Sequence, residues 1–336
     1  KAARIHRYDE PLKLEEIPRP TPRAGQVLIE IIASGVCHTD LHACAGHMSG
    51  SPTLPFVPGH EIVGRVVEIG PEIRTTRVGD LVGVASLHWA CGECEFCLSG
   101  REALCPKLIS TGYDVDGGFA EFTVAPAEFV AHLPGGIDPY KMAPVLCAGV
   151  TTYKALKATD ASPGQWVVIS GVGGLGHLAI QYARALGYRV AAVDIAADKL
   201  ALAERVGAEF VVNAATDNAI ARIHEEIGGA HAVVVTAAAA AAFRTGVGML
   251  RRGGTCVLCG LPPGDFPLPI KDVVLAGQTV RGSIIGTRQD LDEAIDFVIT
   301  HNLHVEIQKR RLDEINTIFA ELESGAVTGR VVLDLS

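Results

Sequence analysis

The stretch that decides the fold is "QWVVISGVGGLGHLAIQYARALG", residues 165–187. It begins with a continuous apolar run, which is typical of a strand buried on both faces of a parallel sheet. Glycines follow in G-x-G-x-x-G spacing at Gly171, Gly173 and Gly176. A helical segment comes next and ends at Gly187, where a C-terminal glycine is expected. A buried strand before the glycines and a helix after them predict a loop that binds the pyrophosphate of a dinucleotide.

Strands and helices alternate downstream of this unit as far as residue 261. The expected strands are YRVAAVDI (188–195), FVVNA (210–214), HAVVVTA (231–237) and TCVLCGL (255–261). The expected helices are ADKLALAERVGA (197–208), AIARIHEEIGG (219–229) and AFRTGVGMLRRGG (242–254), and the alanines at 237–242 are interpreted as a helix start. Alternation at this spacing predicts a doubly wound parallel sheet.

The regions before and after this alternating segment have a different sequence pattern. Short β-branched runs such as QVLIEIIASGVC (26–37) and EIVGRVVEIG (61–70) make the first part β-rich. After residue 286 come two amphipathic helices, in 290–302 and 312–325, and a final strand in 329–336. The fold class predicted for the whole chain is therefore α/β, with a β-rich domain beside the parallel-sheet domain.

Bulk composition limits the classes of function. The chain has 336 residues, which favours two domains, and its net charge of −9 argues against nucleic acid or an anionic membrane as partner. No apolar run reaches the roughly 18 residues that a membrane span needs. The first residues, KAARIHRYDE, lack the apolar core of a signal peptide, so a cytoplasmic protein is expected. In a reducing compartment the nine cysteines favour metal binding over disulfides.

Four cysteines are crowded into the segment CGECEFCLSGREALC (91–105). Together Cys91, Cys94, Cys97 and Cys105 supply four thiolates to one tetrahedral ion and leave no position for a substrate. The spacing predicts a structural zinc site, with an iron–sulfur cluster as the alternative.

A second possible ligand set is scattered along the chain. Cys37, His60 and Cys147 provide a Cys₂His set with one open position, the arrangement of catalytic zinc in alcohol dehydrogenases. The adjacent Glu61 is expected either behind the ligands or as an occasional ligand. Asp194 ends the strand after the glycine loop, where a carboxylate binds the ribose hydroxyls and repels a 2′-phosphate. NAD is therefore expected rather than NADP.

The chain resembles the zinc-dependent medium-chain alcohol dehydrogenases, in particular their tetrameric microbial branch. The resemblance runs nearly end to end through GVCHTDLHA, PGHE, CGECEFCLSG, GYDVDGGFAE, LCAGVTTYKAL, GGLGHLAIQYA, RRGGTCVLCGLP, GSIIGTR and GRVVLDL. It implies a GroES-like catalytic domain at 1–149 with a structural zinc lobe at 91–105, a Rossmann NAD-binding domain at 150–286, and a return to the catalytic domain at 287–336. It also implies two zinc ions per subunit and a homotetramer.

The resemblance also assigns roles to single residues. Alcohol oxygen would take the open position on the Cys37/His60/Cys147 zinc, and the proton would leave through Thr39, the cofactor ribose and His42. Residues expected at the cofactor are His38, Thr151, Gly171, Gly173, Gly174, Leu175, Gly176, Lys199 and Arg330. His47 and His88 lie outside the family's motifs.

The substrate pocket is expected to be wide. Ethanol-preferring relatives often place tryptophans where the neighbouring motifs align Met48 and Ser86, and the tryptophan present, Trp89, falls three residues later. A thioether and a hydroxyl in place of two indoles predict acceptance of bulky aromatic or allylic primary alcohols. The alternatives are a short-chain alcohol dehydrogenase of the ethanol type, a polyol dehydrogenase, and a non-enzymatic zinc- and nucleotide-binding sensor.

Overall fold

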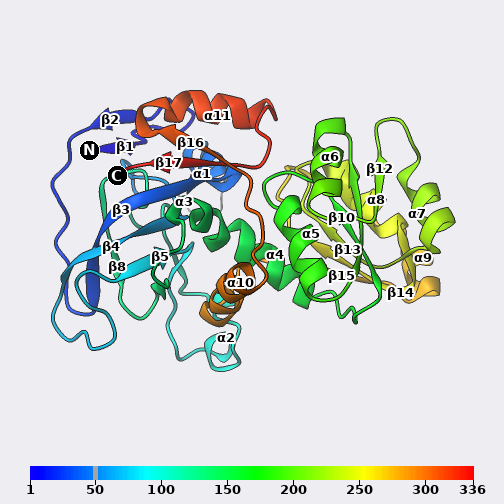
Figure 1. Cartoon of the computed structure of the whole chain (residues 1–336), viewed down its shortest axis with the longest axis horizontal. Helices are drawn as coiled ribbons and strands as arrows, with labels where there is room; N and C mark the ends of the chain where they lie inside the picture. The colour runs from blue at the N-terminus through cyan, green and yellow to red at the C-terminus, as the bar shows by residue number, and fades with distance from the viewer. Residues whose placement is uncertain (48–51) are drawn as a thin grey trace. The chain divides into compact units, whose positions relative to one another are not determined.

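The chain forms two compact units in the computed structural model, which describes residues 1–47 and 52–336 (Figure 1). The first unit comprises residues 1–147, 285–295 and 305–336, and the second comprises residues 148–284 and 296–304. Helix α10 (Arg288–Thr300) contributes residues to both. The domain limits expected at residues 149 and 286 stay a prediction.

The second unit is built on a six-stranded sheet in the order β12-β11-β10-β13-β14-β15, with every pair parallel. Its strands are β10 (Trp166–Ser170), β11 (Arg189–Asp194), β12 (Phe210–Asn213), β13 (Ala230–Val235), β14 (Leu250–Leu258) and β15 (Thr279–Gly282). Its helices are α4 (Ala148–Lys157), α5 (Gly176–Ala185), α6 (Ala197–Arg205), α7 (Ala219–Ile227), α8 (Ala240–Gly248) and α9 (Ile270–Ala276). This Rossmann-like architecture confirms the predicted fold class.

Apolar side chains on both faces of the central strands explain why the sheet is covered by helices. Val167, Val168 and Ile169 of β10 are all fully buried, as the continuous apolar run predicted. One face packs into a cluster with residues of α7 and α8, among them Ile223 and Phe243.

One helix prediction was wrong at its C-terminal end. The segment 242–254 was expected to be helical throughout, but α8 stops at Gly248 and β14 begins at Leu250. Leu250 pairs with Ala230, and the register shifts before Ala232 pairs with Thr255. Glycines at 246, 248, 253 and 254 weaken the helix, so sheet pairing with β13 takes over.

The first unit is β-rich. Its main sheet runs in the order β16-β17-β3-β4-β5-β9, and β8 also pairs with β3. The strands are β3 (Gln26–Val36), β4 (Ile62–Ile69), β5 (Leu81–Val84), β8 (Phe122–Pro126), β9 (Ala131–His132), β16 (Ile307–Arg311) and β17 (Arg330–Asp334). The C-terminal strand β17 pairs antiparallel with β3, so the end of the chain completes the sheet that the first part begins.

Short elements surround this sheet. Two small ladders pair β1 (Ala2–Arg4) with β2 (Lys13–Glu15) and β6 (Leu87–Trp89) with β7 (Ile109–Ser110). The helices are α1 (His38–Cys44), α2 (Glu95–Leu98), α3 (Pro139–Met142) and α11 (Ile315–Glu323), with 3₁₀ turns η1 (Glu102–Leu104), η2 (Ala143–Leu146) and η3 (Leu312–Glu314). Within residues 1–47 and 52–336, no helix combines the length and the apolar character needed to cross a bilayer.

Candidate metal centres and cofactor loop

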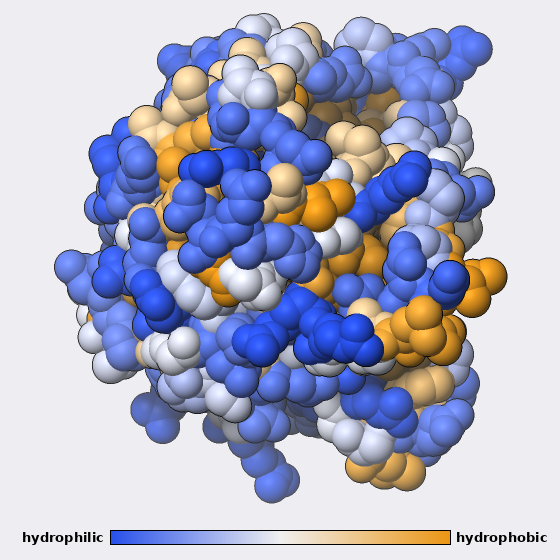
Figure 2. Space-filling view, turned by 90° about the vertical axis from the view of Figure 1, so that its right-hand side faces the viewer, coloured by the Kyte–Doolittle hydropathy of each residue, from blue (hydrophilic) through white to orange (hydrophobic). Residues whose placement is uncertain are grey.

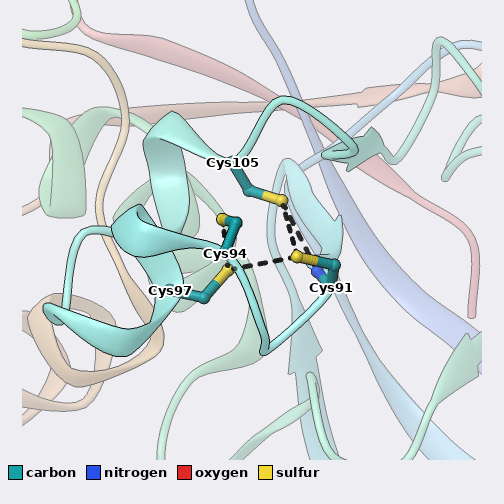
Figure 3. A group of neighbouring side chains, drawn as sticks. All are labelled: Cys91, Cys94, Cys97 and Cys105. Atoms are coloured by element: carbon teal, nitrogen blue, oxygen red, sulfur yellow. Dashed lines mark hydrogen bonds between the residues drawn. The ribbon is translucent and has the colours of Figure 1, made fainter.

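The four crowded cysteines converge on one point (Figure 3). Cys91 follows β6, Cys94 caps the N-terminus of α2, Cys97 lies within α2, and Cys105 follows η1. The sulfur–sulfur distances are 3.5 Å for Cys94–Cys97, 3.6 Å for Cys91–Cys105 and 3.9 Å for Cys91–Cys97. A tetrahedral zinc ion with bonds of about 2.3 Å sets its sulfur ligands roughly 3.8 Å apart, so the group fits such an ion closely.

The local backbone favours a thiolate at one of these cysteines, Cys91. A hydrogen bond from the Glu93 backbone, helped by the one from Cys94, lowers the pKa of Cys91 to about 6. Burial raises the pKa of Cys97 to about 12, and its contacts with the other thiols act in the same direction. Proximity of four sulfur atoms makes the last protons hard to remove without a compensating cation, which a metal ion supplies. All nine cysteines are free thiols.

The scattered ligand set also comes together, entirely within the first unit. Cys37 follows β3, His60 precedes β4, and Cys147 follows η2. These three and Glu61 are buried, and one ligand atom from each lies within 4.8 Å of the others. His60 Nε2 is 3.2 Å from Cys147 Sγ, near the roughly 3.5 Å expected between nitrogen and sulfur ligands of one tetrahedral zinc ion.

Asp40 organises this group, and the sequence analysis missed it. Its side chain is 1% exposed; Oδ1 lies 2.8 Å from His60 Nδ1 and accepts from the Gly59 backbone at 3.2 Å, and Oδ2 accepts from the Cys37 backbone at 2.8 Å. The contact with Nδ1 leaves Nε2 facing the sulfur atoms, as a metal-ligating histidine requires. The available signal was an acidic residue three positions after a helix N-cap.

Glu61 lies behind the ligands in a buried ion pair with Arg330 of β17. Its Oε1 accepts from the guanidinium, whereas Oε2 is buried without a hydrogen-bond partner. The carboxylate occupies space left by Gly35, where a Cβ atom would collide with Oε2. An unpartnered carboxylate oxygen among thiols and an imidazole is the donor chemistry that suits a zinc ion.

Electrostatic effects within this ligand group favour a thiolate at Cys37, whereas they favour the protonated forms of His60 and Glu61 when no metal ion is bound. The hydrogen bond from Cys147, aided by the charges of Arg330 and His60, lowers the pKa of Cys37 well below its usual range. Burial opposes protonation of His60, but Asp40 raises the pKa of His60 well above normal. Burial raises the pKa of Glu61 against the opposing charge of Arg330. A thiolate is thus favoured at Cys37, as zinc binding requires.

The residues expected in a proton path lie on or beside α1. Thr39 follows the ligand Cys37 by two residues, and its Oγ1 is 3.6 Å from Cys37 Sγ. His38 is exposed at the first position of the helix, and His42 is half-buried in its last turn. Burial lowers the pKa of His42, and the charges of His38 and His47 lower it further.

The glycine loop of the second unit has the geometry that its sequence predicts. Gly171 has φ = +98°, and a Cβ atom there would lie 2.7 Å from the Ala237 nitrogen. A Cβ on Gly176 would collide with the Gly171 carbonyl, because α5 begins tightly against the loop. Gly173 faces open space within 4 Å, which leaves room for a phosphate to approach the backbone. Gly174 and Leu175 complete the loop before α5.

Asp194 ends β11 beside this loop. Its Oδ2 accepts from the Val172 backbone at 2.6 Å, and its Oδ1 accepts from Ile195 at 2.7 Å and Ala196 at 3.0 Å. Lys199 is half-buried in α6, and Thr151 is buried in α4. Arg330 belongs to the first unit, where its partner is Glu61. The cofactor roles expected for these residues stay predictions.

Of the two expected pocket residues, one is described. Ser86 is half-buried just before β6, and its carbonyl accepts from the Thr111 backbone at 2.9 Å. Met48 lies outside the described residues.

Comparison with known proteins agrees with this geometry. The family models "Alcohol dehydrogenase GroES-like domain" and "Zinc-binding dehydrogenase" match residues 23–135 and 174–300. An alcohol dehydrogenase of Geobacillus stearothermophilus is 48% identical over 335 residues, covering 100% of this chain and 99% of the relative. One from Moraxella sp. (strain TAE123) is 50% identical over 334 residues, covering 99% of each chain. The crystal structure of the alcohol dehydrogenase from Aeropyrum pernix superposes with a TM-score of 0.92 at 34% identity, covering 99% of both chains. The chain therefore belongs to the zinc-dependent medium-chain alcohol dehydrogenases and is a zinc-containing enzyme of that family.

Proposed function

We propose that the protein catalyses reversible hydride transfer between primary alcohols and NAD, with Cys37, His60 and Cys147 as the ligands of its catalytic zinc. The observation that carries this proposal is the buried group in which these ligand atoms and a Glu61 oxygen lie within 4.8 Å of one another. When bound, zinc acts as a Lewis acid that lowers the pKa of the alcohol hydroxyl, and NAD accepts the hydride. The test is NAD reduction by a panel of alcohols on zinc-loaded protein.

The protein side chains hold the ligands and keep their charges balanced. Asp40 fixes the tautomer and the orientation of His60, so that Nε2 faces the ligand sulfur atoms and would be free to bind the zinc ion. The Arg330 guanidinium balances the charge of Glu61 through Oε1. The other oxygen, Oε2, has no hydrogen-bond partner and is therefore available to the ligand group as a further donor atom. In this proposal Cys91, Cys94, Cys97 and Cys105 hold the second, structural zinc.

Proton release is assigned to Thr39 and His42. Thr39 Oγ1 lies 3.6 Å from the ligand sulfur of Cys37, and His42 lies on the same short helix and is half-buried. His42→Gln removes a proton acceptor, so turnover should fall most at low pH, where hydroxide is too scarce to take the proton. The pH dependence of kcat measures this, and an unchanged profile would exclude His42 from the path.

Preference for NAD is assigned to the Asp194 carboxylate. Three backbone donors hold it beside the glycine loop, so its charge is fixed where the adenosine ribose would bind. Asp194→Ala removes the charge-assisted hydrogen bonds between this carboxylate and the ribose hydroxyls, which are worth about 1.5–3 kcal/mol. The variant should therefore have a kcat/KM with NAD that is roughly 10- to 100-fold lower. The same variant should gain efficiency with NADP. Comparable use of both cofactors by the unaltered protein would contradict the assignment.

A wide substrate pocket is assigned to the positions of Met48 and Ser86. Small changes in a hydrophobic pocket are worth about 1–3 kcal/mol, so benzyl and cinnamyl alcohols should exceed ethanol in kcat/KM by about tenfold. Ser86→Trp should reverse that preference and leave the zinc content unchanged. Ethanol as the best substrate would identify a short-chain enzyme, and polyols as the best substrates a polyol dehydrogenase. Cofactor binding without any turnover would indicate a sensor.

We also propose a cytoplasmic homotetramer. Large apolar side chains toward the C-terminal end of the second unit are exposed by 55–78%, among them Leu261, Ile270, Val274, Leu275 and Ile284. Figure 2 shows hydrophobic areas among the polar surface on this side of the molecule. Strand β15 forms one edge of the parallel sheet and offers backbone groups to a second copy. Light scattering of the purified protein tests the tetramer, which Val274→Glu should weaken.

A further inference from the structure

A buried histidine lies directly behind the glycine loop, at the start of α5. His177 is the second residue of that helix and is 0% exposed. Two of its nitrogen atoms meet the same acceptor: the backbone N–H donates to the Gly173 carbonyl oxygen at 3.3 Å, and ring Nδ1 lies 3.2 Å from that oxygen. Since a carbonyl oxygen can only accept, Nδ1 carries the proton in this contact. The Gly173 carbonyl is therefore held by two hydrogen bonds from one residue.

These hydrogen bonds set the orientation of the peptide group between Gly173 and Gly174. The group is trans and planar, so its C=O and N–H point in opposite directions. Because the carbonyl is directed at His177, the Gly174 N–H points away from α5, toward the side from which a pyrophosphate approaches a loop of this kind. A peptide between two glycines has no Cβ atom to hinder its rotation, so local sterics alone do not hold this orientation.

The backbone of His177 is also held from the helix side. Its carbonyl oxygen accepts from Gln181 Nε2 at 3.0 Å. The same side chain binds the His304 backbone, because Nε2 donates to the carbonyl and Oε1 accepts from the N–H, each at 2.7 Å. Gln181 is 8% exposed, and all three residues belong to the second unit. Buried and held through its backbone, His177 keeps its ring nitrogen on the Gly173 carbonyl.

We propose that His177 is a positioning residue for the cofactor, whose ring Nδ1–H holds the Gly173–Gly174 peptide so that the Gly174 N–H donates to the pyrophosphate of NAD. A carbonyl that accepts two hydrogen bonds also polarises its peptide, which makes the N–H a stronger donor. His177 therefore acts on the affinity for the dinucleotide and not on the hydride step. The inference rests on the proposed use of NAD at this loop.

Two substitutions separate the ring nitrogen from the bulk of the ring. His177→Asn places an amide N–H close to the position of Nδ1 but leaves part of the buried space empty, whereas His177→Leu fills most of that space and has no donor. Both variants lack Nε2, so the comparison between them reports the donor to Gly173. His224→Leu is the matched control, because His224 on α7 directs its ring Nε2 to the Gly248 carbonyl at 3.0 Å, in the same unit but outside the loop.

Dissociation constants are measured by NADH fluorescence on zinc-loaded protein, with ADP-ribose and adenosine as competing ligands. We expect His177→Leu to raise the dissociation constants of NADH and ADP-ribose, and the KM for NAD, about three- to tenfold, as loss of one hydrogen bond does. Adenosine binding should be unchanged, and kcat at saturating NAD should not fall. His177→Asn and His224→Leu should bind NADH as the unaltered protein does, although the cavity in His177→Asn lowers its melting temperature.

Unchanged NADH binding by His177→Leu, or equal weakening in His177→Leu and His177→Asn, would overturn the role of the ring nitrogen. Loss of adenosine affinity equal to the loss of ADP-ribose affinity would overturn the assignment to the pyrophosphate. If His177→Leu does not fold, His177→Ala compared with His177→Asn decides the same question. Failure of the proposed function is recognised separately, since unaltered protein that binds NADH but oxidises no alcohol would contradict the reaction and not the role of His177.

Discussion

Replacing Asp40 with asparagine tests how the fold orients the catalytic ligands. The two side chains have nearly the same shape, so packing is preserved while the charge is lost. Asparagine can keep one oxygen, facing His60 Nδ1 and the Gly59 N–H, as Asp40 Oδ1 does. Its NH₂ group must then face the Cys37 N–H, which now donates to Oδ2 at 2.8 Å. The NH₂ group of the asparagine and the Cys37 N–H, both donors, would then face each other at a position where Asp40 is only 1% exposed.

The cost follows from these contacts. A buried donor left without an acceptor costs about 1–3 kcal/mol. Loss of a partner behind a metal-bound histidine lowers metal affinity about 10- to 100-fold, equivalent to about 1.4–2.8 kcal/mol. Asp40→Asn should therefore bind the catalytic zinc more weakly by that factor, and the four-cysteine site should keep its ion.

Zinc release to a chromogenic chelator measures both sites in one experiment. The unaltered protein and Asp40→Asn should share the phase that belongs to the structural site, and the other phase should be faster only in the variant. Asp116→Asn is the matched control, because Asp116 also accepts a backbone N–H, from Val57 at 2.8 Å, but is exposed. Equal release from Asp40→Asn and the control would refute the orienting role of Asp40.

Two further predictions concern stability. Cys105→Ala should lose the structural zinc and destabilise the first unit by about 4 kcal/mol, the upper range for single substitutions. Cys259→Ala, outside the cluster, should lose no zinc; equal melting temperatures for the two variants would contradict a structural site. His88 is 5% exposed, and burial lowers its pKa to about 4. The unfolded chain takes up this proton near pH 6.5, so the stability that neutral His88 contributes is complete above that pH and declines toward pH 4, by about 2 kcal/mol between pH 7 and 5. Urea unfolding should show a smaller pH dependence in His88→Gln, and equal slopes would exclude His88 as the cause.

Local sequence patterns predicted the parts of the structure that depend on neighbouring residues. The glycine loop and the four-cysteine lobe both lie within short segments, and the spacing of their residues nearly determines their geometry. The helix expected over 242–254 failed because sheet pairing between Leu250 and Ala230, twenty residues apart, outweighed local helical periodicity.

Contacts distant in sequence could not be derived in the same way. Asp40 reaches His60 across twenty residues, and Arg330 reaches Glu61 across 269. Nothing in the local sequence of Arg330 distinguishes a cofactor contact from the buried ion pair that the fold forms. The gathering of Cys37, His60 and Cys147 was expected from the ligand set and the family resemblance, whereas the hydrogen bonds that orient them required the structure.

The most direct test of the account combines zinc content and NAD-dependent alcohol oxidation in Cys147→Ala. Cys147 is assigned to the catalytic zinc alone and lies outside the four-cysteine lobe. We predict that this variant loses one of the two zinc ions and its alcohol oxidation, while the chain stays folded and keeps the structural ion. A variant that retains both ions and normal turnover would contradict the assignment of Cys37, His60 and Cys147 as the catalytic centre.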